Sequence, residues 1–319
     1  MKGIGFKIDQ KISEVLEKNQ FTLSAEVIPP RNGAQQARVL SQVQRLVECG
    51  AQFLSVTKGA GGSLRGGSLP IAQIIKEQLG VPCIAHFACR DLTPQDVENL
   101  LMDHHYFGIR NILALRGDPP NNQPDWKPRE GSYPYAYQLC EQIERLNRGK
   151  YLHRPGGKDV GAREATDFCI GVACYPEHPD PIERVSFLKR KIEAGGQYGI
   201  TQMLFDPEAY ARYLDLLGSH QISLPIIPGT KLLKNKEQAR RMESMFQVKV
   251  SEAFLKSLPE TKEDEDPARA LDLFLSFVEK LRSYGAPGIH LFVLFDTEAS
   301  CEVIQQLRKQ NGRSESNEL

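Results

Sequence analysis

The sequence predicts an α/β protein built as a closed (β/α)8 barrel, with an extra N-terminal helix and a long insertion after the fourth strand. Eight short, apolar, β-branched runs recur along the 319 residues. Segments with apolar residues at i, i+3 and i+4 separate these runs, which is the alternation of parallel βαβ units. No G-x-G-x-x-G motif follows the first run, where an open dinucleotide-binding fold would carry it. The barrel is therefore favoured, with an open doubly wound sheet as the alternative.

The expected strands begin about twenty residues into the chain. In order they are residues 21–28, 53–59, 82–88, 111–117, 168–175, 199–205, 224–229 and 288–295. A helix expected at about 7–18 precedes them and would cover the bottom of the barrel. Residues 118–167 form the long insertion, with a helix at about 135–148, and insertions of this length usually carry function.

Local signals mark the ends of the helices. Thr93 followed by Pro94 predicts a helix start, because threonine caps and proline suits the first helical position. Gly50, Gly108 and Gly195 stand where helices are expected to end. We expect one catalytic barrel domain over residues 1–310 and a disordered polar tail over 311–319.

The composition excludes several classes of protein. Forty Lys and Arg residues balance 40 Asp and Glu residues, which gives no electrostatic reason to expect nucleic acid as a partner. No run approaches the roughly 18 apolar residues of a membrane span, and no signal peptide is visible, so the expected location is cytoplasmic. The seven cysteines are odd in number and include no C-x-x-C, which argues against a disulfide framework and against a metal site.

Strand ends are where such a barrel places its catalytic residues. Alternation along the first strand puts Thr22, Ser24 and Glu26 on the inward face. A carboxylate at that position is either a structural ion-pair partner or a general acid with a raised pKa. The glycine-rich run 59–62 after the second strand is either a phosphate-binding loop or a plain flexible one. His86 on the third strand is either hydrogen-bonded structure or a ligand.

Further polar groups follow the fourth, fifth and sixth strands. The fourth strand ends in Arg116, Gly117 and Asp118. This turn either binds a ligand or contains a surface salt bridge between Arg116 and Asp118. The sequence Tyr-Pro-Glu-His-Pro at 175–179 ends the fifth. Gln202 lies within an apolar strand and needs hydrogen-bond partners if it is buried.

Six ordered motifs lie between residues 24 and 206, within a similarity that runs from about residue 22 to about 305. They are S-A-E-V-I-P-P-R, V-T-K-G-A-G-G-S-L-R, A-H-F-A-C-R, N-I-L-A-L-R-G-D-P-P, G-V-A-C-Y-P-E-H-P and I-T-Q-M-L-F-D. Together they resemble the methylenetetrahydrofolate reductase family, the flavin-dependent barrel enzymes of one-carbon metabolism and methionine biosynthesis. The resemblance implies ping-pong reduction of 5,10-methylenetetrahydrofolate to 5-methyltetrahydrofolate by NAD(P)H. It also implies a homo-oligomer as a candidate state.

The resemblance further implies FAD at the carboxyl ends of the strands. By motif, the FAD contacts are Thr57, His86, Arg116, Gly117, Asp118, Tyr135, Ala136, Ala173, Tyr175, His178 and Lys191. Arg116 and Lys191 suit the pyrophosphate, and Tyr175 suits a flat ring.

The same resemblance implies the catalytic and substrate-binding residues. Glu26 is the expected general acid, with a pKa raised by burial and by the nearby Asp118. Asp118 is expected to tune the flavin. Glu26, Asp118 and Gln202 are expected to bind the folate.

Departures from the family pattern occur near the expected FAD adenosine, at Arg184, and where the second substrate would bind, at Lys236 and at 294–296. Arg184 replaces an Asp, Lys236 stands near the place of an aromatic residue, and Leu294-Phe295-Asp296 replaces L-N-R. Two alternatives remain, and the changes at Lys236, Phe295 and Asp296 support the first of them. One is an FAD-binding barrel that is an accessory subunit of a redox complex, and the other is a flavin enzyme with a different pterin or amine substrate.

Overall fold

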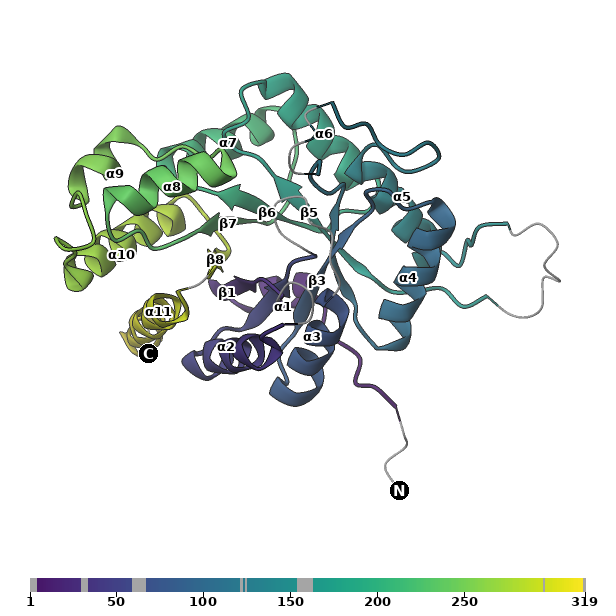
Figure 1. The fold of residues 1–319 in the computed structure, drawn as a ribbon, viewed down its shortest axis with the longest axis horizontal. Coiled ribbons are helices and arrows are strands. Elements are labelled where there is room, and N and C mark those ends of the chain that lie inside the picture. The colour runs from purple at the N-terminus through teal and green to yellow at the C-terminus, as the bar shows by residue number, and fades with distance from the viewer. Residues whose placement is uncertain are drawn as a thin grey trace.

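Eight parallel strands close into a barrel in sequence order, surrounded by helices (Figure 1). The computed structural model describes residues 5–29, 34–58, 67–120, 123, 125–153, 163–294 and 296–317. Closure is made by β1 pairing with β8, in a register that sets Glu26 beside Phe292. The predicted (β/α)8 barrel is confirmed, and the open sheet is excluded.

Every strand overlaps one of the expected runs. The strands are β1 (Thr22–Val27), β2 (Phe53–Val56), β3 (Cys83–Ala88), β4 (Asn111–Leu115), β5 (Cys169–Cys174), β6 (Tyr198–Met203), β7 (Ile226–Thr230) and β8 (Gly288–Phe292). The helices are α1 (Ile12–Lys18), α2 (Gln36–Cys49), α3 (Ser68–Ile74), α4 (Pro94–Tyr106), α5 (Ala136–Asn147), α6 (Pro181–Glu193), α7 (Pro207–Ser219), α8 (Lys236–Phe246), α9 (Glu252–Ser257), α10 (Pro267–Ser283) and α11 (Thr297–Asn317), with a π-helical turn, η2 (Ile75–Leu79).

Helix ends follow the local chemistry of the sequence. Thr93 caps α4: its hydroxyl accepts from Asp96 N–H at 3.2 Å, and the Asp96 carboxylate accepts from Thr93 N–H at 2.9 Å. Gly50 ends α2 at φ +107°, a conformation that side-chain-bearing residues avoid. The long insertion between β4 and β5 contains α5, as expected.

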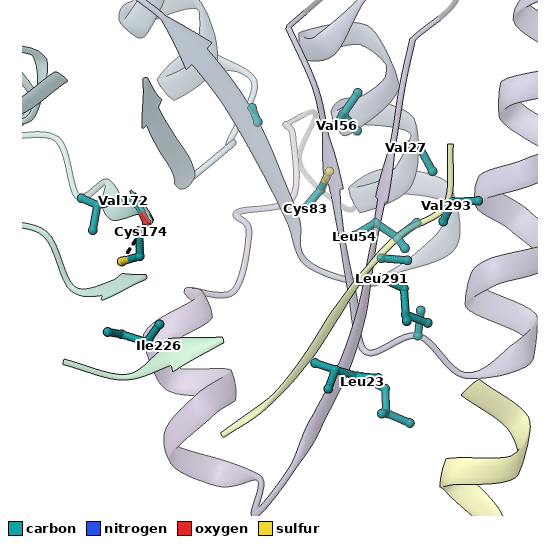
Figure 2. Close-up of a cluster of buried hydrophobic side chains, with 14 of the residues drawn as sticks. Leu23, Val27, Leu54, Val56, Cys83, Val172, Cys174, Ile226, Leu291 and Val293 are labelled. Carbon is teal, nitrogen blue, oxygen red and sulfur yellow. Dashed lines mark hydrogen bonds between the residues drawn. The ribbon is translucent and has the colours of Figure 1, made fainter. Parts of the chain in front are cut away.

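Two apolar layers stabilise the barrel. Outward side chains of the strands pack beneath the helices, among them Leu23, Leu54 and Leu291 (Figure 2). A second cluster fills the barrel interior, and α1 contributes Ile12 and Leu16 to it from below. Alternation on β1 is therefore as predicted, with apolar residues outward and polar residues inward.

The N-terminal segment is held in the barrel bottom by Asn111 at the start of β4. The Asn111 side chain accepts the Ile12 N–H at 2.8 Å and donates to Asp9 at 3.0 Å and to the Gln10 carbonyl at 2.8 Å. The helix begins at Ile12, later than expected, because Asp9 and Gln10 are not helical and are engaged by the Asn111 side chain. The bottom of the barrel is thus closed by the chain's own N-terminal segment.

The C-terminal helix α11 has helical backbone through Asn317, which includes most of the expected polar tail. Side chains from residue 312 onward lie outside the described part of the structure. The division into a domain at 1–310 and a tail at 311–319 stays a prediction. Among the described residues, no helix is both long enough and apolar enough to cross a membrane.

Candidate active site

A cavity of about 530 Å³ opens at the carboxyl ends of the strands. Parallel strands of a barrel all end on one rim, so residues distant in sequence meet there. The cavity is lined by every residue that the sequence nominates for the site: Glu26, Thr57, His86, Arg116, Gly117, Asp118, Tyr135, Ala136, Ala173, Tyr175, His178, Lys191 and Gln202.

Glu26 is a buried carboxylic acid on the inner wall of this cavity. Burial raises the pKa of Glu26 to about 8, so the carboxyl is protonated near neutral pH. Its nearest ionisable neighbour is His86, whose Nε2 lies 3.4 Å from Glu26 Oε2. Asp118 is exposed and is not a cause of this pKa shift. The expected contribution of Asp118 was therefore wrong, because water screens an exposed carboxylate at the rim.

His86 is buried beside Glu26 and carries no charge near neutral pH. Burial lowers the pKa of His86 to about 3. Its Nε2 is within 3.4 Å of Glu26, yet the geometry leaves this nitrogen without a hydrogen-bond partner in the described structure. The pair is thus a neutral acid next to a neutral imidazole, and neither group is an ion-pair partner of the other.

A second polar layer lies one step deeper in the barrel. His290 on β8 contacts the hydroxyls of Ser24 and Ser55, with Nδ1 at 2.8 Å and Nε2 at 2.9 Å. Burial, and to a smaller extent His86, lowers the pKa of His290 to about 3. These hydrogen bonds satisfy the polar interior beneath Glu26 without adding a charge to it.

The turn after β4 is held by a residue that sequence reasoning missed. Gly117 has φ +93°, and a Cβ there would lie 3.0 Å from Arg90 Cβ. The buried Arg90 guanidinium donates to the Asp118 carbonyl. Arg116 donates to the Gly117 carbonyl at 3.2 Å, and within the described chain neither Arg116 nor Asp118 forms an ion pair, so the salt-bridge interpretation is not supported. Both charged side chains are exposed at the rim.

Two cations on α6 bond to backbone carbonyls. Lys191 Nζ donates to Ala173 O at 2.7 Å and lies 5.6 Å from the centre of the Tyr175 ring. Burial lowers the pKa of Lys191. Arg184 donates to the carbonyls of Pro176 and His178. Carbonyls do not neutralise the charge of either cation, so both cations remain available to an anionic ligand at this wall, which Glu183 also lines.

Aromatic rings flank the same side. Tyr135 stacks on Tyr137 with centroids 5.5 Å apart and an interplanar angle of 13°, and Phe187 lies 5.6 Å from Tyr135. Tyr135 and Tyr175 remain 43% and 48% exposed, so their rings are available to a planar ligand.

Gln202 lies on β6 at an irregularity in its pairing with β7. Its Oε1 accepts from Met203 N–H at 2.9 Å. Its Nε2 makes no hydrogen bond to any described residue and is available at the cavity wall. The interpretation of a fully satisfied core glutamine is therefore not supported.

A family model described as methylenetetrahydrofolate reductase matches residues 11–308. The chain belongs to the methylenetetrahydrofolate reductase family.

Relatives within the family differ in length. The Escherichia coli K12 5,10-methylenetetrahydrofolate reductase is 29% identical over 309 residues, which cover 94% of each chain. Methylenetetrahydrofolate reductase (NADH) 1 of Arabidopsis thaliana is 27% identical over 316 residues, and the chain spans about half of that protein, 50%. A solved Clostridium thermocellum protein described as binding two copies of 5-methyl-5,6,7,8-tetrahydrofolic acid shares the fold, with TM-score 0.58 and 14% identity, over 93% of this chain and 99% of that one.

The departures from the methylenetetrahydrofolate reductase pattern lie partly outside the cavity. Lys236 begins α8 and pairs with Glu260 at 2.5 Å, away from the cavity lining. Asp296 pairs with Lys234 at 2.9 Å and accepts from Ala299 N–H at the start of α11. Arg184 does line the cavity. Phe295 and the run 59–62 lie outside the described residues.

Some cavity residues carried no signal in the sequence. Phe246 and Leu294 line the cavity from the last turn of α8 and from the segment after β8. Phe292 also lines it, and alternation from His290 along β8 would have found it. Among the described residues, no three His, Cys, Asp or Glu side chains are grouped as a metal site requires.

Proposed function

We propose that this chain is an FAD-dependent methylenetetrahydrofolate reductase that reduces 5,10-methylenetetrahydrofolate to 5-methyltetrahydrofolate with NAD(P)H, in ping-pong order. The observation that carries the proposal is a protonated, buried Glu26 in a cavity that is also lined by cations and by aromatic rings. Bound FAD would supply hydride transfer, which no side chain can provide.

The residues present fit a flavin dinucleotide. Thr57 Oγ1 and His86 Nε2 are buried polar atoms without hydrogen-bond partners in the described structure, and each lines the cavity. Buried polar groups of this kind are normally satisfied, and a ligand would satisfy them here. The exposed rings of Tyr135 and Tyr175 would cover a planar heterocycle.

The cations fit the diphosphate of the same ligand. Lys191 and Arg184 bond only to carbonyls among the described residues, and Arg116 is exposed at the rim. A phosphate would gain charge-assisted hydrogen bonds from them, which are stronger than bonds between neutral groups. We therefore assign Arg116 and Lys191 to the diphosphate.

Glu26 is the proposed proton donor to the nitrogen that leaves the methylene bridge. A general acid must carry its proton at the working pH, and burial holds the Glu26 proton up to about pH 8. The neutral His86 leaves this proton on the acid, because an imidazolium at that distance would favour the carboxylate. Gln202 Nε2, which makes no hydrogen bond within the described residues, is the proposed partner of the pterin ring.

Cofactor binding is tested directly with the purified protein. The preparation should be yellow, and Arg116→Ala should weaken FAD binding by about 1.5–3 kcal/mol, the value of a hydrogen bond to a charged group. Titration of flavin fluorescence measures the affinity. A protein that stays colourless after incubation with FAD would refute the proposal.

The accessory-subunit alternative rests on Lys236 and Asp296, which are engaged in ion pairs of their own. Reoxidation of the reduced protein by 5,10-methylenetetrahydrofolate separates the two functions. A reductase is reoxidised by the folate, whereas an accessory barrel is not. The same assay with NADH and NADPH identifies the donor.

A further inference from the structure

The helices α2 and α11 form a packed pair on the outside of the barrel, distant along the chain but side by side in space (Figure 1). Gln42 on α2 donates to Thr297 Oγ1 at 3.0 Å, and Arg45 pairs with Glu298. A Cβ at Gly50 would lie 2.3 Å from Arg308 Cδ, so the end of α2 is in close contact with α11. These contacts fix the alignment of the two helices along their length.

Two free thiols meet at this contact. Cys49 is the last residue of α2, and Cys301 lies in α11. Cys301 Sγ donates to the Arg45 carbonyl at 3.7 Å, and Gln305 Nε2 donates to Cys49 Sγ at 3.7 Å. Residues 45 and 49 are one helical turn apart, as are 301 and 305, so the two contacts bring the thiols together. Consistent with this proximity, Cys49 is among the groups that raise the pKa of Cys301.

We propose that Cys49 and Cys301 form a redox-sensitive dithiol that closes to a disulfide when it meets a peroxide. The Cys49 thiol gives its proton to solvent, and its thiolate attacks a peroxide oxygen. The O–O bond breaks and hydroxide leaves, taking up a proton to become water and giving a sulfenic acid. The Cys301 sulfur then attacks the Cys49 sulfur, the S–O bond breaks, and a second water leaves. Two thiols are oxidised to one disulfide and one hydrogen peroxide is reduced to two waters.

Accessibility sets the order of these events. All seven cysteines lie in the described chain, and Cys49 alone is not buried. Cys301 is 4% exposed, and burial raises its pKa to about 12. Cys49 is therefore the thiol that meets the oxidant, and Cys301 is the one that resolves it. At Cys301 the Arg45 guanidinium lowers the pKa, but burial has the larger effect.

Oxidation of the full-length protein, with whatever cofactor it carries, tests the proposal. One equivalent of hydrogen peroxide should remove two free thiols per chain, and peptide mapping should find residues 49 and 301 cross-linked. Dithiothreitol should restore both thiols. The oxidised protein should also melt at a higher temperature, because the bond closes a loop that contains most of the chain and restricts its unfolded state.

Single variants provide the controls. Cys49→Ser should abolish the loss of thiols, and Cys301→Ser should leave a sulfenic acid on Cys49 that dimedone traps. If the Cys301→Ser variant fails to fold, the thiol count of Cys49→Ser and the peptide map of the oxidised wild type still test whether the disulfide forms. Unchanged thiols, or a modified Cys49 with Cys301 free, would overturn the proposal. None of these readouts depends on catalysis, so the result stands apart from the proposed function.

Discussion

Glu26 and His86 are two titratable side chains that lose their water together at the barrel mouth, with opposite results for their pKa values. Burial penalises the charged form of each group, so the pKa of the acid rises to about 8 and that of the imidazole falls to about 3. Both side chains are therefore neutral at pH 7. The site holds one transferable proton and no fixed charge at the place where the proposed reaction needs an acid.

Replacement of this acid tests its role. Glu26→Gln keeps the shape and removes the proton, so the folate half-reaction should slow by about 10²–10⁴-fold. The NAD(P)H half-reaction needs no proton from Glu26 and should keep its rate. Stopped-flow absorbance separates the halves. An equal loss in both, or none in the folate half, would show that Glu26 is not the acid.

The pH dependence follows from the same burial. Glu26 is active as an acid only while protonated, so the folate half-reaction should fall as pH rises through about 8. The rate of the NAD(P)H half-reaction should not show this decrease with pH, and neither should the residual folate half-reaction of Glu26→Gln. A folate half-reaction that stays constant from pH 6 to about pH 10 would contradict the assignment.

At the scale of the element, the turn after β4 depends on Gly117. An alanine there would adopt a left-handed backbone at a cost of about 1–3 kcal/mol and would also press on Arg90, which holds the Asp118 carbonyl. Gly117→Ala should therefore lose FAD affinity as well as stability. Gly131→Ala is the matched control: Gly131 has φ +79° with nothing within 4 Å of the added Cβ, so only stability should fall. Equal FAD affinities in the two variants would show that the Arg90 contact is unimportant.

The N-terminal segment is an element whose stability should depend on pH. Asp9 is buried against Cys83 N–H and Asn111, with Lys76 and Arg110 nearby, and burial outweighs these partners and raises the pKa of Asp9 to about 7. An acid with a raised folded pKa favours folding fully below its unfolded value of 3.8, and this contribution is lost as pH rises through about 7. Wild-type stability should therefore fall over that range, by at most about 1.4 kcal/mol per pH unit for this group.

Asp9→Asn removes this titration and should make the protein more stable than wild type at pH 8 but not at pH 4. Chemical denaturation at both pH values measures the difference. The raised pKa of Glu26 also lowers stability as pH rises, so Asp9→Asn should keep part of the dependence of the unfolding free energy on pH. The exposed Asp215→Asn on α7 is the control and should leave the slope unchanged. Identical slopes for wild type and Asp9→Asn would contradict a role for Asp9.

At the scale of the whole molecule, alternation and motifs predicted the strands, and with them the inward position of Glu26. The location of the cavity was also predictable, because the carboxyl ends of all the strands lie on one rim of the barrel and the candidate residues were taken from those ends. Arg90 was missed because its contact with Asp118 exists only after β3 and β4 pair. Phe246 was missed because α8 reaches the cavity through tertiary packing. The ion pairs of Lys236 and Asp296 could not be predicted either, because the positions of their partners depend on how the loops fold. The homo-oligomer stays a prediction.

The pairing of β1 with β8 has a consequence for the timing of synthesis. Glu26 lies on the first strand of the barrel in chain order, yet its neighbour across the seam is Phe292 on the last. The Glu26 carbonyl also accepts from Val293 N–H at 3.2 Å. Contacts between such distant residues form late in folding. A nascent chain therefore carries Glu26 as an ordinary, ionised carboxylate until the last strand arrives. Glu26 is therefore buried, and its pKa raised, only once β8 closes the barrel, so a chain truncated before β8 should lack the proposed proton donor.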